Sequence, residues 1–311
     1  MSPPKSGTLS PRPRRHAPGW VRIFVIGSAL WLATVLITFA TENANLVPTL
    51  ILLGSFLVPV TFAAFALERA DEVLTPQHVL TAFVYGGVTG VLGASLLESV
   101  FLRHPSGLTY LGVGLIEEGV KLAALWLLAR TVLRYTMRDG LALGAAVGFG
   151  FAAFESAGYA FNALFTRDGL SLLDAVESEV LRGILAPVGH GLWTAILGGA
   201  LFATAARGGR PRPSTALLGW FVVVVLLHAF WDASPSIAQW LTPLLTASPS
   251  QAPLRFGAGP GALTSAQLRL ATMLSWALFA LDALVGLLIL RARQRRAAVP
   301  AVTGPTRSAM T

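Results

Sequence analysis

The 311-residue chain is strongly apolar: hydrophobic residues make up 54% of it, charged residues only 12%, and its mean hydropathy is +0.66. Soluble domains carry about 25% charged residues, so the composition excludes a water-soluble enzyme and indicates an integral membrane protein. The net charge of +8 does not indicate nucleic-acid binding, because lysines and arginines gather in loops and tails between apolar runs, as in membrane proteins. With 0 cysteines, disulfides, thiol catalysis and cysteine-ligated zinc are excluded.

Apolar runs follow one another along the chain, each close to the about 20 residues that a membrane-spanning helix needs. They are too long for the strands of a lipid-facing barrel. We therefore expect an all-α fold, a polytopic bundle of about eight transmembrane helices. The predicted spans are Trp20–Thr41, Leu46–Leu67, Val79–Leu102, Leu108–Ala129, Gly140–Phe161, Leu181–Ala206, Thr215–Ala233 and Leu268–Leu290.

The basic residues divide unevenly between alternate loops. Both tails and every second loop carry most of them, whereas the opposite loops hold only Arg103, Arg167, Arg182, Arg255 and Arg269. Positive charge marks the cytoplasmic side. The asymmetry predicts an even number of spans in the plasma membrane, with both termini cytoplasmic.

The tails differ in composition from the bundle. Residues 1–19 are rich in proline and arginine, and the segment 292–311 is similar, so both are predicted to be disordered basic tails. Between them, 20–291 is the predicted helical bundle. Its polar residues concentrate between 108 and 233, which is the predicted catalytic-type core.

Several ionisable residues stand inside the apolar runs. They are Glu117, Glu118, Lys121, Glu155, His190, His228 and Asp232. A charge at the bilayer centre costs about 2.5–3.5 kcal/mol per residue on insertion scales, so such residues indicate a functional site. At 1.5 Å rise per residue, Glu117, Glu155, His190 and His228 lie about 8–15 Å below the outer ends of their spans. We therefore expect them to share one layer in the outer half of the membrane.

Spacing within two of the helices predicts specific pairs. Lys121 follows Glu117 by four residues and Glu118 by three, so it can pair with either carboxylate. His228 and Asp232 are also four residues apart, so Asp232 can orient the imidazole or join it in binding a metal.

Glu155 shares a helix face with Tyr159, whose hydroxyl could donate a hydrogen bond to an oxyanion or to the carboxylate.

The polar residues also have structural interpretations. Taken by itself, His190 could form a hydrogen bond to a neighbouring helix, and the charged pairs could be structural ion pairs or caps. Glu98 and Asp282 stand alone in or near spans, and we interpret both as structural.

Four motifs occur in a fixed order between Leu108 and Ala233. They are Glu117-Glu118-Gly-Val-Lys121, Phe151-Ala-Ala-Phe-Glu155, His190 and His228-Ala-Phe-Trp-Asp232. This ordered set resembles the PrsW family of intramembrane proteases, distant relatives of the CAAX prenyl endopeptidases and bacteriocin-processing membrane proteins. The resemblance implies hydrolysis of a membrane-associated protein, for example an anti-sigma factor, near the extracytoplasmic side.

The resemblance leaves two mechanisms open. In a metal version, His190, His228 and Glu155 would hold Zn²⁺, which activates a water molecule. In a metal-free version, Glu117 or Glu118 would act as general base, and a histidine would stabilise the oxyanion.

Two other classes of function remain as alternatives. A proton-coupled transporter or channel would also use buried carboxylates and histidines, but it predicts polar groups along a path through both leaflets, often with an inverted repeat. A non-catalytic membrane scaffold would bind a partner helix without needing these groups. The single predicted layer of polar groups favours the protease.

Overall fold

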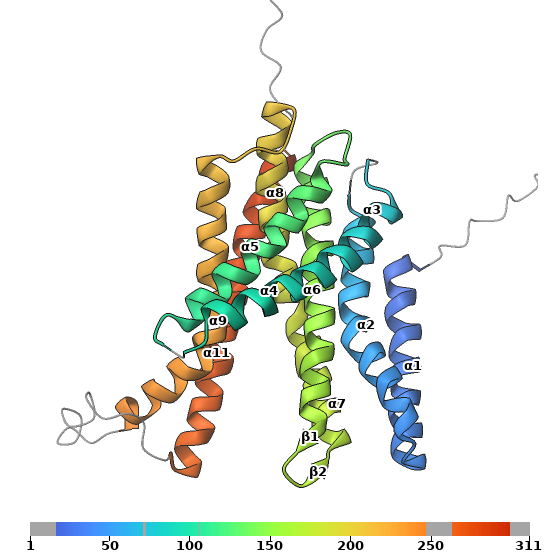
Figure 1. The fold of residues 1–311 in the computed structure, drawn as a ribbon, viewed down its shortest axis with the longest axis vertical. Helices are drawn as coiled ribbons and strands as arrows, with labels where there is room; N and C mark the ends of the chain where they lie inside the picture. The colour runs from blue at the N-terminus through green and yellow to red at the C-terminus, as the bar shows by residue number, and fades with distance from the viewer. Residues whose placement is uncertain (1–16, 71–72, 105, 247–262, 299–311) are drawn as a thin grey trace, which may run out of the picture.

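The computed structural model describes residues 17–70, 73–104, 106–246 and 263–298. Within these ranges the chain is almost wholly helical (Figure 1), which confirms the all-α class. The main helices are α1 (Gly19–Thr41), α2 (Val47–Leu67), α3 (Pro76–Thr81), α4 (Gly87–Phe101), α5 (Thr109–Ala129), α6 (Met137–Leu164), α7 (Leu172–Leu185), α8 (His190–Gly208), α9 (Thr215–Thr246) and α11 (Ser265–Ala298). A short hairpin, β1 (Phe165–Thr166) and β2 (Gly169–Leu170), joins α6 to α7.

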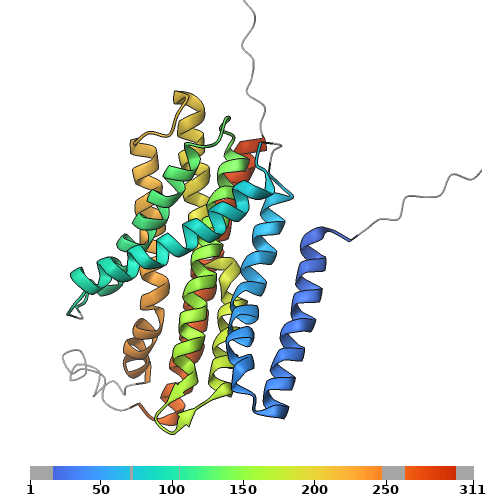
Figure 2. The same cartoon turned by 45° about the vertical axis from the view of Figure 1, so that its right-hand side comes forward.

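Seven of the predicted spans coincide with candidate membrane helices. In the described part of the chain, 7 helical segments are long and apolar enough to cross a membrane. Helix α5, which carries three charged side chains, occupies the place of the remaining predicted span, and its crossing of the membrane stays a prediction. The start of α1 and the end of α11 lie at the same end of the bundle (Figures 1 and 2). The cytoplasmic location of that end stays a prediction.

One segment is strongly tilted. Helix α3, a π-helical turn η2 (Ala82–Gly86) and α4 form one rod that crosses α6 obliquely (Figure 1). Gly86 and Gly90 lie directly against Val147 and Phe151 of α6. Because these glycines lack side chains, the rod can lie close to α6 and form one wall of the candidate functional site.

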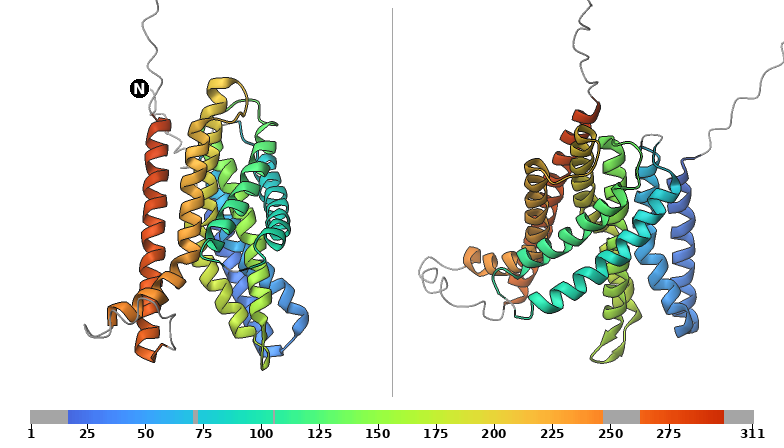
Figure 3. Two further views of the ribbon diagram at one scale, coloured as in Figure 1. Left: turned by 60° about the vertical axis from the view of Figure 1, so that its left-hand side comes forward. Right: turned by 45° about the horizontal axis from the view of Figure 1, so that its top comes forward.

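Helices α6 and α8 form the centre of the bundle (Figure 3). Gly140, Gly144 and Gly148 of α6 each face a backbone carbonyl of α8, and a Cβ at any of the three would overlap it. The small-xxx-small spacing therefore serves close helix packing. Gly148 contacts the carbonyl of His190, so this packing also sets the height at which α8 begins.

The predicted span Leu181–Ala206 is wrong as a single helix. Helix α7 ends at Leu185, a 3-10 turn covers Ala186–Val188, and α8 begins at His190. Pro187 contributes to the break because proline has no amide hydrogen to continue the helical bonding, and the backbone leaves the helical conformation at Gly189, with φ −101° and ψ −126°. The break places His190 on the first residue of a helix.

Two other predicted ends differ from the structure. Helix α9 continues past Ala233 through two prolines to Thr246, so the predicted outer loop from Ser234 begins as helix. Ser234 Oγ donates to the Phe230 carbonyl at 2.7 Å, the kind of contact that lets membrane helices tolerate proline. Helix α11 runs to Ala298, past the predicted bundle end at 291. Residues 292–298, predicted as part of a disordered tail, are helical. Residues 1–16, 247–262 and 299–311 lie outside the described residues, and with them the rest of the predicted disorder of the tails.

Candidate functional site

Helix α5 contributes three charged side chains that are buried together. Glu117 is 6% exposed, and Glu118 and Lys121 are 0% exposed. Lys121 Nζ donates to Glu117 Oε2 at 3.0 Å and to Glu118 Oε1 at 2.9 Å, and it lies 3.7 Å from the centre of the Phe151 ring. An unpaired charge in such an interior costs several kcal/mol, so these contacts are what permit the burial.

His190 links α5 to α6. Its Nδ1 lies 2.7 Å from Lys121 Nζ, and its Nε2 lies 3.1 Å from Glu155 Oε2. A lysine ammonium has only donors, so Nδ1 accepts and Nε2 carries the hydrogen that Glu155 accepts. The ring also contacts Phe151 and Trp193, with centroids 5.1 and 5.3 Å away. Hydrogen bonds therefore hold both nitrogens of this imidazole, and two aromatic rings pack against it.

His228 of α9 completes the group. Its Nδ1 donates to Glu118 Oε1 at 3.0 Å, and its Nε2 lies 3.4 Å from Asp232 Oδ2 and 3.7 Å from Glu117 Oε2. The ring stacks on Trp193 with centroids 4.8 Å apart. The predicted pairing of His228 with Asp232 on one helix face is thus present, and Glu118 orients the other nitrogen.

Arg182 belongs to the site although the sequence predicted it in an outer loop. Its side chain is partly buried (25% exposed), forms an ion pair with Glu155 and donates from Nε to Ser156 Oγ at 2.8 Å. Its guanidinium also lies 4.1 Å from the centre of the Tyr159 ring, so Tyr159 packs on Arg182, with 52% of its surface exposed. An arginine within the apolar run was the one signal that could have identified it.

A cleft of about 440 Å³ between α4, α5, α6 and α9 borders the charged residues. Glu117, His228 and Asp232 line it, and so does Glu98, which sequence reasoning had classed as structural. A smaller cavity of about 90 Å³ reaches His190 beside α7. A groove of about 580 Å³ between α2, α6, α8 and α11 is largely apolar and contains none of these residues, so we place the site at the cleft.

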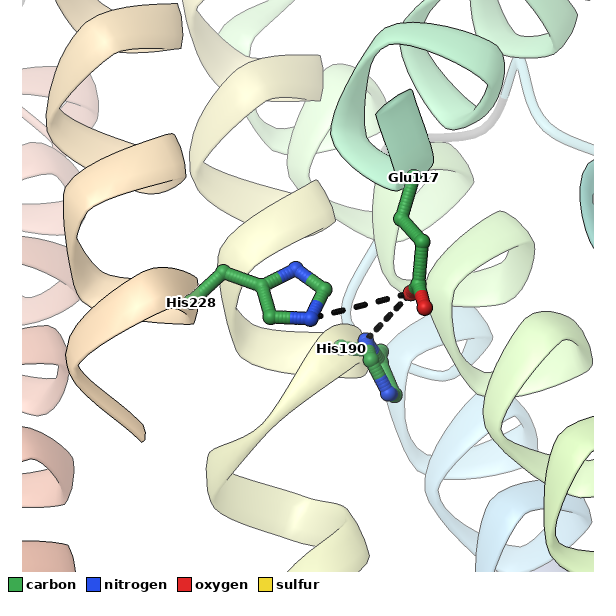
Figure 4. Close-up of side chains that lie close together, drawn as sticks. All are labelled: Glu117, His190 and His228. Carbon is green, nitrogen blue, oxygen red and sulfur yellow. Dashed lines mark ion pairs between the residues drawn. The ribbon is translucent and has the colours of Figure 1, made fainter. Parts of the chain in front are cut away.

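Glu117, His190 and His228 form a group that could hold a metal ion (Figure 4). One ligand atom from each lies within 4.8 Å of the others, and two histidines with one carboxylate are a ligand set typical of open catalytic zinc sites. Two further carboxylates hydrogen-bond to the histidines: Glu118 to His228 and Glu155 to His190. Metal-binding histidines usually have such a carboxylate partner. The residue types therefore fit a metal. The carboxylate in this group is Glu117, where the sequence favoured Glu155.

A family model described as PrsW family intramembrane metalloprotease matches residues 75–257, more than half of the chain. The matched range runs from the start of the tilted rod through α9 and contains every residue of the site. No curated protein and no solved structure matches the chain.

Proposed function

The chain belongs to the PrsW family of intramembrane metalloproteases, and we propose that it hydrolyses a peptide bond of a membrane-anchored protein in the cleft beside Glu117. The family resemblance seen in the sequence is thereby confirmed. One observation carries the proposal: helices α5, α6, α8 and α9 bring carboxylates and imidazoles into a single buried network that borders a cleft. Water and a polypeptide can meet charged groups there.

The two adjacent glutamates have different surroundings, and we assign them different roles. Glu117 lines the cleft, whereas Glu118 is fully buried and holds Lys121 and His228. Glu117 is therefore the carboxylate that can meet the attacking water and take its proton. Glu118 is a positioning residue. The role of Glu117 as base belongs to the metal-free version; in the metal-dependent version, Glu117, His190 and His228 would instead hold the metal ion, which when bound would lower the pKa of a water molecule to about 7.

The histidines are oriented for different tasks. In the metal-free version, His228 would donate from Nε2, which lies at the cleft near Asp232, to the oxyanion that forms on the substrate carbonyl. In the metal-dependent version, this nitrogen would bind the ion instead. Glu155 accepts from His190 Nε2 and so keeps Nδ1 directed at the cluster. Arg182 in turn holds Glu155.

We propose that the substrate is cut toward the extracytoplasmic side, with an anti-sigma factor as the substrate class that the family resemblance implies. Helix α8 runs from His190 to Gly208, about 27 Å at 1.5 Å per residue, toward the end of the bundle where α1 starts and α11 ends (Figure 1). If that end is cytoplasmic, as the arginines indicate, the site lies in the outer half.

The test is cleavage of tagged single-span proteins, anti-sigma factors among them, in liposomes that contain the purified full chain. We expect Glu117→Gln to slow cleavage by about 100-fold or more. Glu42→Gln, at an exposed residue that ends α1, is the matched control and should cleave at the wild-type rate.

Wild-type cleavage by Glu117→Gln would overturn the assignment. If the wild-type chain cleaves none of these proteins but conducts protons in a manner that depends on Glu155, the transporter alternative replaces the protease.

A further inference from the structure

We propose that Lys121 is an internal competitor for the metal position, so that a metal ion enters only when the Lys121 ammonium withdraws. The inference rests on the proposed function only in taking Glu117, His190 and His228 as the metal-binding residues. It adds a role for a residue that is not itself one of the three.

Lys121 fills a complete cation site. Its three hydrogens match three acceptors, at 3.0 Å from Glu117, 2.9 Å from Glu118 and 2.7 Å from His190 Nδ1. The Phe151 ring covers the remaining side at 3.7 Å, which is a favourable position for a cation. The side chain is 0% exposed. Two of its three acceptors belong to the group that could hold a metal.

Lys121 and a metal ion would compete for the same nitrogen of His190. An imidazole nitrogen has one lone pair, and Nδ1 directs its lone pair at Lys121 Nζ at 2.7 Å. A metal bound to Nδ1 at the usual distance of about 2.0–2.1 Å would use the same lone pair and overlap Nζ. The other nitrogen, Nε2, is committed to Glu155 at 3.1 Å. Lysine and metal therefore exclude each other at this imidazole.

The site also offers Lys121 a place to withdraw to. Glu118 Oε1 already binds both Lys121 and His228, whereas its other oxygen, Oε2, is buried and has no hydrogen-bond partner among the described residues. An ammonium that leaves Glu117 and His190 can keep its ion pair by moving toward Glu118 Oε2. Withdrawal then frees one carboxylate and one imidazole together, both of which a metal requires.

The experiment measures zinc affinity of the detergent-purified full chain by competition with a chromophoric chelator. We expect Lys121→Ala to bind zinc about tenfold or more tightly than wild type, the range that neighbouring groups contribute to metal affinity. Adding His190→Ala to that variant should remove the gain. Lys5→Ala removes the other lysine of the chain and is the matched control. Equal zinc affinity in wild type and folded Lys121→Ala would overturn the proposal.

A second variant keeps the proposal testable in case Lys121→Ala does not fold. Lys121→Met has an unbranched side chain of similar length but cannot donate to His190 Nδ1 or to Glu117. We expect it also to bind zinc about tenfold or more tightly than wild type; zinc affinity equal to that of wild type would overturn the proposal. Neither measurement requires cleavage, so failure of the proposed function, seen as absent proteolysis, is distinguishable from failure of the competition.

Discussion

The interface between α6 and α8 and the charged cluster around Lys121 adjoin each other, but different forces hold them. At the interface, Gly140, Gly144 and Gly148 bring two backbones into direct contact, which leaves little freedom for adjustment. In the cluster, long side chains from different helices are held by ion pairs and hydrogen bonds. Close backbone packing therefore positions the helices, and the charged side chains form their ion pairs and hydrogen bonds within that arrangement.

We therefore expect substitutions at the α6–α8 interface to impair folding more than substitutions in the charged cluster. We expect Gly144→Leu to yield no folded protein, because its side chain would overlap the Thr194 backbone and the cost exceeds a total stability of about 5 kcal/mol. Size-exclusion chromatography in detergent measures this. Gly158→Leu is the control on the same helix, since nothing lies within 4 Å of a Cβ at Gly158. A folded Gly144→Leu protein would contradict the close packing.

A change in the cluster should be severe without abolishing folding. Glu118→Ala removes the acceptor that Lys121 and His228 share, and loss of one partner from a buried ion pair costs about 3–5 kcal/mol. Unfolding monitored by circular dichroism with added denaturant measures the loss. Glu177→Gln, at an exposed carboxylate on α7, should stay within about 0.5 kcal/mol of wild type. Equal stability of the two variants would show that Glu117 and His190 suffice to hold Lys121.

The smallest effect is expected at the edge of the cluster. Arg182 donates from separate nitrogens to Ser156 and Glu155, and lysine cannot reproduce this fork. We expect Arg182→Lys to slow cleavage about tenfold by releasing Glu155 from His190, with stability changed by about 1 kcal/mol or less. The measurement is the cleavage rate beside an unfolding curve. A wild-type rate would mean that Glu155 holds His190 without help from α7.

The amino-acid sequence was enough to predict an all-α membrane protein. Apolar runs of about 20 residues predict membrane helices because the bilayer leaves few alternatives for the backbone. Charged residues in these runs pointed to the site, and the order of their motifs identified the family. The pairs Glu117–Lys121 and His228–Asp232 were predictable because residues four apart on a helix are neighbours whatever the tertiary structure.

Contacts between residues of different helices could not be predicted from the sequence and came from the packed bundle. How the helices tilt and rotate against one another decides whether Lys121 meets His190 and whether Arg182 meets Glu155. The same geometry places Glu98 on the wall of the cleft. Local sequence carries no record of that, because interhelical angles follow from side-chain packing summed over whole interfaces. The break at Pro187 shows the same limit: hydropathy continued through it, while the backbone turned and placed His190 at the start of a new helix.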